Sequence, residues 1–385
     1  MRLIGASVLE FRRTLDGKSW NPSFRWTQRR APLLLLHAEN GQTGLGEAWS
    51  HQNAVEPVLT HLAQTVAPQL VGRDLDVPAL RPESLASTAI AGTEPWVGPA
   101  AASAVDVASW DLRAKAMRLP LWQALTGTTA SGRGVAHVYA SGGLYRDGAT
   151  TEDLAREATS YVANGFTAIK MKIGALSLAD DLERVGAVRN VVGPDVELWV
   201  DAVNRLAAQD ALAWCQALAG LGVRAIQAPV AFDDVAGMAR INRYGLPVIA
   251  AETEFRPARF EVLLEAGAVS WLQFCLGLCG GLTGAMRLDA MAAARHIPSS
   301  PQCFSTAVLQ AASLHFAAAS RNAPLVEYHR FHDHLSALLP PALRTVVAGR
   351  IVIDDAPGLG IGPIAPGPQP CGGEIILRAR IGRLH

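Results

Sequence analysis

The segment Ala168-Ile169-Lys170-Met171-Lys172-Ile173 decides the fold. It is a short apolar run with lysine at two alternate positions, which predicts a buried strand carrying both lysines on one face. Ala- and Leu-rich stretches with helical spacing lie before and after it. A strand flanked by helices is typical of a parallel crossover unit, because parallel neighbours cannot be joined by a tight hairpin.

Seven further runs of this kind predict strands, spaced about 25–30 residues apart with a helix between each pair. Eight strands joined by helices predict an α/β fold in which a parallel sheet closes into a TIM-type barrel. The eight predicted strands are Ala136–Ala140, Ala168–Ile173, Glu197–Asp201, Ala225–Ala228, Pro247–Glu252, Ser270–Cys275, His296–Ser299 and Leu325–Tyr328.

The rest of the chain predicts a second domain. Residues 1–130 are read as an α+β domain, in which two apolar strands, 31–38 and 43–49, flank a hairpin signal. Residues 131–345 form the predicted barrel domain. The tail, residues 346–385, contains another hairpin-like passage after the barrel is complete, so we expect it to return and pack on the N-terminal domain.

Composition excludes several classes of protein. Of 385 residues, 34 are Lys or Arg and 34 are Asp or Glu, so the net charge is zero and a nucleic-acid partner is disfavoured. The five cysteines follow no disulfide or zinc spacing, which favours a reducing cytoplasm. We read no signal peptide at the start. The uncharged stretch 266–286 is long enough to span a bilayer, but its glycines favour a buried strand, a turn and a helix start over a membrane segment.

Candidate chemistry gathers at the carboxyl ends of the predicted strands, where barrels of this type carry their active sites. Only four residues of the chain are lysine, and two of them are Lys170 and Lys172. Two ammonium groups held close together repel, which would lower the pKa of one and make it a usable base. Asp201 and Glu252 end two other strands, and their hard oxygen atoms suit magnesium.

Six motifs in this order resemble the enolase superfamily, in its mandelate racemase / muconate lactonizing enzyme branch. They are Ser103-Ala-Val-Asp-Val-Ala-Ser-Trp-Asp-Leu-Arg-Ala-Lys115, Lys170-Met171-Lys172, Val200-Asp201-Ala202, Ala251-Glu252, Gly280-Gly281-Leu282-Thr283 and Pro357-Gly358-Leu359-Gly360. The resemblance implies a modified (β/α)7β barrel, covered by an α+β capping domain that both ends of the chain build.

The resemblance also implies roles for individual residues. Lys172 would be the general base that removes the proton next to a substrate carboxylate. Lys170 would modulate the pKa of Lys172 and contact that carboxylate, and Glu327 would hydrogen-bond it. Asp201 and Glu252 would bind Mg²⁺, which holds the carboxylate and stabilises the enediolate.

Three departures from the family pattern shape the expected reaction. Gln227 stands where the family usually has a third acidic ligand, so metal binding should weaken. Cys275 and Gln302 stand where a second base would act on the opposite face of the substrate, so racemisation by two bases is disfavoured. What remains is chemistry on one face. We therefore expect a dehydratase of a sugar acid or other small hydroxy acid, with Lys172 as the base and then the acid.

Other residues are candidates for contact with the substrate. His329, which follows Glu327, and His51 are further candidate acids. The aromatic segment Trp20–Trp26 is read as a specificity loop without regular structure, because it contains asparagine and proline. Arg25 in this segment is a candidate for binding a distal anionic group.

Alternatives to this interpretation stay open. The lysines could be solvated charges at strand ends, Asp201 and Glu252 could cap helices, and Glu327 could pair with Arg330. The protein could then be a degenerate family member that binds a small carboxylate or a partner without catalysis. A metal-independent isomerase is a third reading. Family resemblance suggests a homo-oligomer, either a dimer or an octamer.

Overall fold

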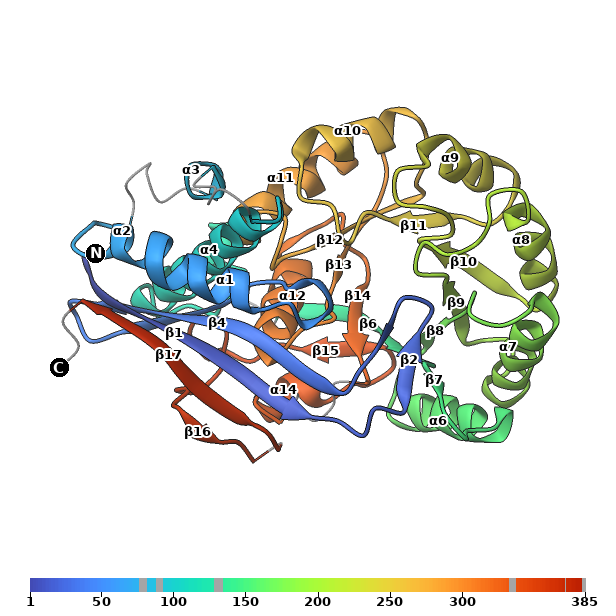
Figure 1. Ribbon diagram of the computed structural model, residues 1–385, viewed down its shortest axis with the longest axis horizontal. Coiled ribbons are helices and arrows are strands. Elements are labelled where there is room, and N and C mark those ends of the chain that lie inside the picture. Colours follow the sequence, from blue (N-terminus) through green and yellow to red (C-terminus); the bar gives the residue numbers. More distant parts are fainter. Residues whose placement is uncertain (76–81, 88–92, 128–133, 332–336, 371, 383–385) are drawn as a thin grey trace.

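The computed structural model describes residues 1–75, 82–87, 93–127, 134–331, 337–370 and 372–382. Figure 1 shows a ring of parallel strands inside a ring of helices, with a sheet of long antiparallel strands to one side. The ring is the predicted barrel and the sheet belongs to the predicted capping domain. The boundary expected at residue 130 lies outside the described residues, and the one at 345 stays a prediction.

The barrel strands run in the order β13-β12-β11-β10-β9-β8-β6-β14, and each pairs in parallel with its neighbours along this path. One hydrogen bond links the two ends of this path, since Ser300 Oγ of β13 donates to the carbonyl of Leu325, the residue before β14, over 2.8 Å. The strands are β6 (Val135–Gly142), β8 (Ala168–Lys172), β9 (Glu197–Asp201), β10 (Val223–Gln227), β11 (Val248–Ala250), β12 (Trp271–Cys275), β13 (Ser299–Gln302) and β14 (Val326–His329).

Helices alternate with these strands, as the (β/α)7β prediction requires. They are α6 (Thr151–Ala163), α7 (Leu178–Val192), α8 (Ala211–Gly220), α9 (Val235–Tyr244), α10 (Pro257–Glu265), α11 (Gly281–Ala293) and α12 (Ala307–Ala319). Buried apolar side chains fill the lower part of the barrel, with Tyr139 4.8 Å from Trp199 and Trp199 5.5 Å from Trp271 between ring centroids. This plug leaves the polar residues of the strands to the upper end.

The capping domain consists of one antiparallel sheet and several helices. The sheet has the order β16-β17-β1-β4-β5, and the pairing of β17 with β1 confirms that the tail returns to the N-terminal region. Its strands are β1 (Leu3–Thr14), β4 (Gln28–Ala38), β5 (Thr43–Glu47), β16 (Gly367–Pro368) and β17 (Glu374–Gly382). Its helical segments are η1 (His51–Asn53), α1 (Glu56–His61), η2 (Leu62–Val66), α2 (Ala67–Leu70), α3 (Pro82–Ala86), α4 (Val97–Ala116) and α5 (Leu121–Thr126).

Smaller elements complete the chain. Strand β15 (Arg350–Val352) pairs antiparallel with β6 and so adds the start of the tail to the barrel sheet. Helix α14 (Pro341–Arg344) precedes it. A three-stranded sheet joins β2 (Ser19–Asn21) and β3 (Phe24–Arg25) to β7 (Tyr145–Arg146), a barrel element.

Buried carboxylates of the capping domain attach it to the barrel at the N-termini of two barrel helices. Glu47 accepts hydrogen bonds from the backbone N–H and the hydroxyl of Thr306, at 2.9 and 2.5 Å, where α12 begins. Asp106 accepts the corresponding pair from Thr283, at 2.9 and 2.6 Å, at the start of α11. The orphan N–H groups of a helix start are thereby satisfied across the domain boundary. This fixes the capping domain over one end of the barrel.

The same contacts explain two glycine motifs of the sequence. A Cβ atom on Gly281 would lie 2.4 Å from Oδ2 of Asp106, and one on Gly358 would lie 2.2 Å from Oδ1 of Asp111. Both glycines also have positive φ angles, 69° and 69°. Asp111 accepts from the N–H groups of Leu45 and Leu359, at 2.9 and 2.8 Å, so helix α4 connects the sheet to the tail. These motifs hold the domains together.

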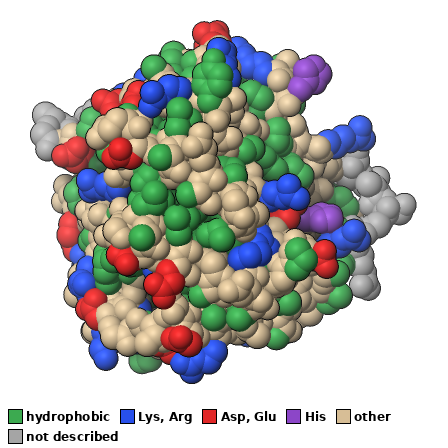
Figure 2. Space-filling model, turned by 90° about the vertical axis from the view of Figure 1, so that its right-hand side faces the viewer, with side chains coloured by type: hydrophobic (Ala, Val, Ile, Leu, Met, Phe, Trp, Pro, Cys, Tyr) green, Lys and Arg blue, Asp and Glu red, His purple; other side chains and the backbone are tan. Residues whose placement is uncertain are grey.

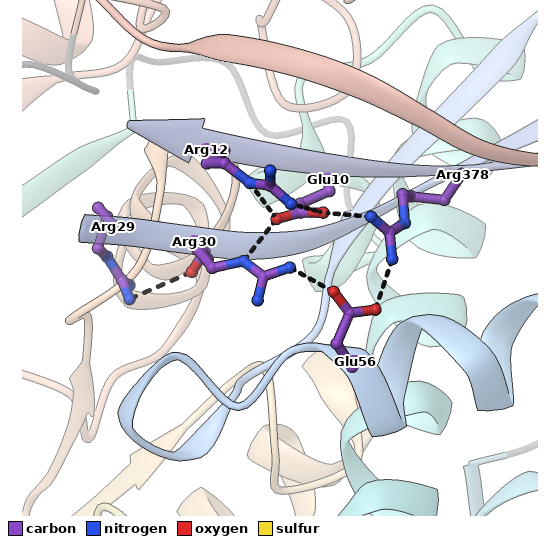
Figure 3. Close-up of polar contacts among 6 residues, drawn as sticks. All are labelled: Glu10, Arg12, Arg29, Arg30, Glu56 and Arg378. Carbon is purple, nitrogen blue, oxygen red and sulfur yellow. Dashed lines mark hydrogen bonds and ion pairs between the residues drawn. The ribbon is translucent and has the colours of Figure 1, made fainter. Parts of the chain in front are cut away.

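A cluster of charges fastens strand β17 to the start of the chain (Figure 3). Glu10 on β1 is fully buried and forms ion pairs with Arg12, Arg30 and Arg378, at 3.0, 2.6 and 3.0 Å. Burial alone would raise the pKa of Glu10, but the arginines outweigh it and lower the pKa. Glu56 bridges two of the same arginines from helix α1. The tail is thus held by charge as well as by the strand ladder.

Two local predictions were wrong. The strand expected at residues 296–299 lies at Ser299–Gln302, because His296 has a φ of 57° and the chain still turns there. The segment Trp20–Trp26 is not irregular, since β2 and β3 pair as a hairpin. Oδ1 of Asn21 accepts from the N–H groups of Ser23 and Phe24, both at 2.8 Å, so the asparagine and proline form the turn and leave its flanks free to pair.

The surface agrees with the balanced composition. On the face that Figure 2 shows, basic and acidic side chains are interspersed. The uncharged stretch around residues 266–286 contains β12, a glycine turn and the start of α11, as predicted. In the described part of the chain, no helix is long and apolar enough to cross a membrane.

Candidate active site

A cavity of about 600 Å³ lies between the upper end of the barrel and the capping domain. The predicted site residues Lys172, Glu252, Gln302 and Glu327 line it from the barrel, and His51 lines it from the capping domain. A cavity of this size suits a small molecule. The structure therefore brings the barrel candidates together at one opening.

The two lysines of β8 both point into the barrel. The ammonium of Lys170 donates to Oε1 of Gln227 and to Oε1 of Glu327, both at 2.6 Å. The ammonium of Lys172 forms an ion pair with Oδ2 of Asp201, and Lys170 lies 3.7 Å from the same oxygen. Both lysines are buried, which excludes the reading of solvated charges at a strand end.

The acidic residues of the site are neither helix caps nor partners of surface arginines. Glu327 is directed at Lys170, and its Oε2 accepts the N–H of Cys303 at 3.0 Å. Glu252 lies just beyond β11 and accepts from the amide nitrogen of Gln227. Oδ1 of Asp201 accepts the N–H of Val203 at 2.9 Å. Each carboxylate is therefore held in place at the upper end of the barrel.

Burial and charge shift the pKa values of these groups in opposite directions. Burial raises the pKa of Glu252 to about 7, Asp201 contributes to the rise, and the lysines offset it only in part. Burial also disfavours the charged forms of Glu327 and Lys170, but their mutual attraction outweighs it. The pKa of Glu327 is lowered and that of Lys170 is raised.

The raised pKa of Lys170 makes it the charged member of the pair. Three carboxylates near Lys170 outweigh burial and so raise its pKa. Lys170 is therefore a permanent cation of the site, while Lys172 is the lysine that borders the cavity.

The backbone at the site is strained. Val203, Ala228 and Ala251 have φ angles of 51°, 44° and 97°, values that residues with a β-carbon rarely adopt. They directly follow or closely flank the side chains of Asp201, Gln227 and Glu252. Strain of this kind persists where the surrounding structure holds it, and it gathers at functional sites.

Cys275 and Gln302, on the strands far from β8 in the barrel, supply no strong base. Cys275 is fully buried, and burial raises the pKa of its thiol, so it stays protonated. Gln302 has no group that titrates. Burial, the two lysines and Arg29 lower the pKa of His329 well below 6.5, and its ring packs 4.3 Å from that of Phe304. A neutral imidazole of this kind is a weak acid, which argues against His329 as the proton donor.

Four residues predicted to contact the substrate do not line the cavity: Trp20, Arg25, Cys275 and His329. Arg25 forms an ion pair with Asp147 at 2.5 Å and donates to the carbonyl of Gly17, so it is engaged outside the cavity. Trp20 stacks on Tyr145 at 4.7 Å between ring centroids and joins the hairpin to β7. Neither residue lines the cavity. Their neighbours Phe24 and Trp26 do line it, because alternate residues of the hairpin point to opposite sides.

Sequence reasoning missed several residues of the cavity. Arg29 reaches it from β4 and donates to the carbonyl of Phe304 at 2.8 Å, with its guanidinium 5.1 Å from the centre of the Phe304 ring. The predicted strand began two residues too late to include it. Extending the strand to Gln28 would have placed Arg29 and Arg30 on opposite faces, one toward the barrel and one toward the charge cluster of Figure 3.

Oxygen donors for a metal ion come from three neighbouring strands. Asp201 ends β9, Gln227 ends β10 and Glu252 follows β11. No group of three His, Cys, Asp or Glu side chains in the described residues is arranged to hold a metal. Two carboxylates and one amide oxygen are nevertheless hard donors of the kind that Mg²⁺ accepts together with water and substrate oxygens. The donor set fits magnesium, with one charge fewer than three carboxylates would supply.

The fold and this site define a class of capped (β/α)7β-barrel proteins with a Lys-x-Lys pair opposite carboxylates. The family model described as "Enolase C-terminal domain-like" matches residues 153–365. The model of the mandelate racemase / muconate lactonizing enzyme N-terminal domain matches residues 23–126. The chain therefore belongs to the mandelate racemase / muconate lactonizing enzyme branch of the enolase superfamily.

Named relatives agree with this assignment. The chain is 28% identical over 326 residues to arabinonate dehydratase of Saccharolobus solfataricus, covering 84% of this chain and 86% of the relative. It is 29% identical over 377 residues to D-galactarolactone cycloisomerase of Agrobacterium fabrum, covering 92% and 94%. A crystal structure of a racemase from Streptomyces coelicolor A3(2) with bound magnesium is 25% identical, with a TM-score of 0.82 and coverage of 94% and 97%. The relatives are enzymes, and they support acid-sugar chemistry of this superfamily.

The opposite pKa shifts of Glu252 and Glu327 predict opposite effects of their neutral variants. The pKa of Glu252 is raised in the folded protein, so ionising it costs stability, and the cost grows as pH rises from about 4.5 to about 7. With metal removed by a chelator at pH 8, Glu252→Gln should raise the free energy of unfolding by roughly 2 kcal/mol. Chemical denaturation measures this difference.

Glu327→Gln is the matched control. Its pKa is lowered, so its charge adds stability above its ordinary pKa of 4.5, and that stability is lost as pH falls. This variant should therefore destabilise the protein at pH 8. Equal destabilisation by both variants would contradict the charge distribution described above.

Proposed function

We propose that the protein is a magnesium-assisted lyase that removes a proton next to the carboxylate of a small hydroxy acid and expels a hydroxyl from the adjacent carbon. The observation that carries the proposal is the position of Lys172, a buried amine at the floor of the cavity and in contact with Asp201. Dehydration fits a site with a strong acid–base group on one face alone.

Each side chain of the site has a role that follows from its position. Lys172 in its neutral amine form is the base that takes the proton from the α-carbon, and the ammonium thus formed is the acid that gives a proton to the departing hydroxyl on the same face, which leaves as water. Lys170 stays charged between Gln227 and Glu327, where its positive charge stabilises negative charge that develops on the substrate carboxylate. Glu327 orients Lys170.

Asp201, Glu252 and the amide oxygen of Gln227 are the residues that would hold Mg²⁺. When bound, the ion supplies a Lewis acid that holds the substrate carboxylate and stabilises its enediolate. The raised pKa of Glu252 supports this assignment. It indicates a carboxylate around which the positive charge of the lysines does not offset burial and the neighbouring carboxylates. The magnesium bound in the crystal structure of the Streptomyces coelicolor racemase supports it as well.

One observation favours a second candidate, a metal-independent isomerase or a binding protein. Gln227 already uses both ends of its amide, since the oxygen accepts from Lys170 and the nitrogen donates to Glu252. A closed hydrogen-bond network of this kind does not require a metal to satisfy its members.

Exchange of the α-hydrogen tests the assignment of Lys172. In deuterium oxide with magnesium, a panel of hydroxy acids should include one whose α-hydrogen exchanges or whose hydroxyl is lost, as followed by proton NMR. Lys172→Ala should lower the rate at least about 100-fold, since a positioned general base contributes that much. Lys18→Ala is the matched control, because Lys18 is exposed and does not line the cavity. Exchange that persists in Lys172→Ala would refute the assignment.

Titration calorimetry with magnesium chloride tests the metal assignment. The wild-type protein should bind Mg²⁺, Asp201→Asn should bind it much more weakly, and Gln227→Glu should bind it about tenfold more tightly, because divalent affinity follows the charge of the ligands. No heat from the wild type at millimolar metal, with binding by Gln227→Glu, would favour the metal-independent candidate.

A further inference from the structure

The backbone of Lys172, the last residue of β8, is held by contacts that lie outside the cavity. Its N–H donates to the carbonyl of Gly143, just beyond the end of β6, at 3.2 Å. Its carbonyl accepts from Nη1 of Arg184 on α7 at 2.9 Å, and Nη2 of Arg184 donates to the carbonyl of Gly143 at 3.1 Å. The planar guanidinium of Arg184 therefore bridges the ends of two neighbouring barrel strands.

Arg184 is fixed in turn by a buried network. It is only 8% exposed, and its Nη1 also donates to Oδ1 of the fully buried Asp181 at 2.8 Å. Oδ2 of Asp181 accepts from the N–H of Gly174 at 2.7 Å. The hydroxyl of Tyr145 donates to the carboxylate of Asp181 at 2.8 Å and accepts from the N–H of Ala175 at 3.1 Å. These side chains therefore hold both the end of β8 and the residues that follow it.

The position of these contacts matters because the side chain of lysine is a flexible four-carbon stem. A general base must lie within hydrogen-bond reach of the proton that it removes. The direction in which the amine of Lys172 points starts from its backbone, and Arg184 fixes that backbone where the ladder between β6 and β8 ends. Supporting contacts of this kind keep a functional side chain in its productive geometry.

Tyr145 links this arrangement to the capping domain. The guanidinium of Arg184 lies 3.9 Å from the centre of the Tyr145 ring, and a cation at this distance is attracted to the face of an aromatic ring. The indole of Trp20 stacks on the same ring at 4.7 Å. Trp20 belongs to β2, whose hairpin partner β3 carries Phe24, a residue of the cavity. One stack of side chains thus connects the hairpin beside the cavity to the backbone of Lys172.

We propose that Arg184 is a positioning residue for Lys172, and that Tyr145 and Trp20 make its position depend on the hairpin. Arg184 does not line the cavity, so it acts on the reaction only through the backbone of Lys172. The importance of this contact for catalysis rests on the proposed function, in which Lys172 is the base. The effect on the amine itself does not, and it can be measured without a substrate.

Only four residues of the chain are lysine, so the side chain of Lys172 can be observed directly by NMR. In protein labelled with ¹³C at the lysine ε-carbons, the signal of Lys172 is the one that Lys172→Arg removes. In Arg184→Ala with magnesium chloride, we expect this signal to shift toward the position of a freely moving lysine, because the backbone is no longer held. The signal of Lys170 should stay in place, since Gln227 and Glu327 hold that ammonium.

Arg189→Ala is the matched control. Arg189 lies on the same helix and also donates to backbone carbonyls, those of Gly193 and Val196, at 2.6 and 2.8 Å. These carbonyls precede β9, whereas Lys172 ends the parallel strand β8, so they lie toward the opposite end of the barrel. This variant should lose stability in a similar way and leave the Lys172 signal unchanged.

An open cavity of about 840 Å³ beside the stack allows a chemical rescue. Trp20, Tyr145 and Arg184 all line it, so a small cation can enter the space that Arg184→Ala leaves. Methylguanidinium chloride at tens of millimolar should return the Lys172 signal at least halfway to its wild-type position. Methylammonium chloride should not, because an ammonium is a point charge without the planar fork that bridges two carbonyls.

Trp20→Ala tests the link to the hairpin. It should shift the Lys172 signal in the same direction as Arg184→Ala but by a smaller amount, because the stack loses one member. In the double variant the signal should lie where Arg184→Ala alone puts it, since the hairpin acts through Arg184. Additive shifts of the two single variants would overturn this link.

Three results would overturn the positioning role of Arg184. They are an unchanged Lys172 signal in folded Arg184→Ala, an equal shift in Arg189→Ala, and restoration by methylguanidinium that is absent or no greater than by methylammonium. Circular dichroism checks that each variant is folded. Should Arg184→Ala not fold, Arg184→Gln takes its place, because its amide keeps a donor but has neither the charge nor the reach of the guanidinium.

Exchange of the α-hydrogen is read separately. If an acid exchanges, Arg184→Ala should lower kcat at least about tenfold with little change in KM, because a misplaced base slows chemistry more than binding. The expected signal shift with no exchange in any acid would refute the proposed function and leave the positioning role supported. Undiminished exchange in Arg184→Ala would overturn the positioning role alone.

Discussion

The structure depends on the balance of charge inside the upper barrel. The buried ammonium groups of Lys170 and Lys172, the buried carboxylates of Asp201 and Glu327 and the partly buried Glu252 lie within one hydrogen-bonded network. None of the buried charges would tolerate burial alone. Gln227 limits the excess of negative over positive charge to one, because a carboxylate at this position would add a second negative charge in excess of the two ammonium groups. With glutamine at position 227, Glu252 is the one carboxylate in excess of the two ammonium groups, and its raised pKa reflects this excess of negative charge. By this count the site carries one negative charge in excess, which the proposed metal ion would offset.

The capping domain is fixed over this charge network by its contacts with the barrel. Glu47 and Asp106 satisfy the N-termini of two barrel helices, and Asp111 joins the capping helix to the returning tail. These contacts are buried, so the capping domain has little freedom to shift over the barrel opening. Its aromatic residues consequently form a fixed wall of the cavity. Phe24, Trp26, Trp49 and Trp96 line the cavity from the capping domain and Lys172, Glu252 and Glu327 from the barrel, so the domain interface sets the distance between these two groups.

Much of this could be predicted from the sequence, because the relevant signals are local. The alternation of Lys170 and Lys172 predicts one inward face, and the spacing of strands predicts the barrel. Arg25 failed as a candidate since its partner, Asp147, lies 122 residues away. The pKa of Lys170 likewise depends on Asp201, Glu252 and Glu327, which only the closed barrel brings near it. The sequence shows which side chains of a strand share one face. The sum of the charges around a buried atom can be known only from the folded structure.

The central claim is that acid–base chemistry acts on one face of the substrate, from Lys172, with Cys275 and Gln302 inert on the other. The most direct test uses a single enantiomer of an acid with an asymmetric α-carbon, incubated with the protein in deuterium oxide and examined by NMR and chiral chromatography. We predict that the recovered acid contains deuterium with its configuration retained. Racemic deuterated acid, formed as fast as the label enters, would reveal a second base and contradict the claim.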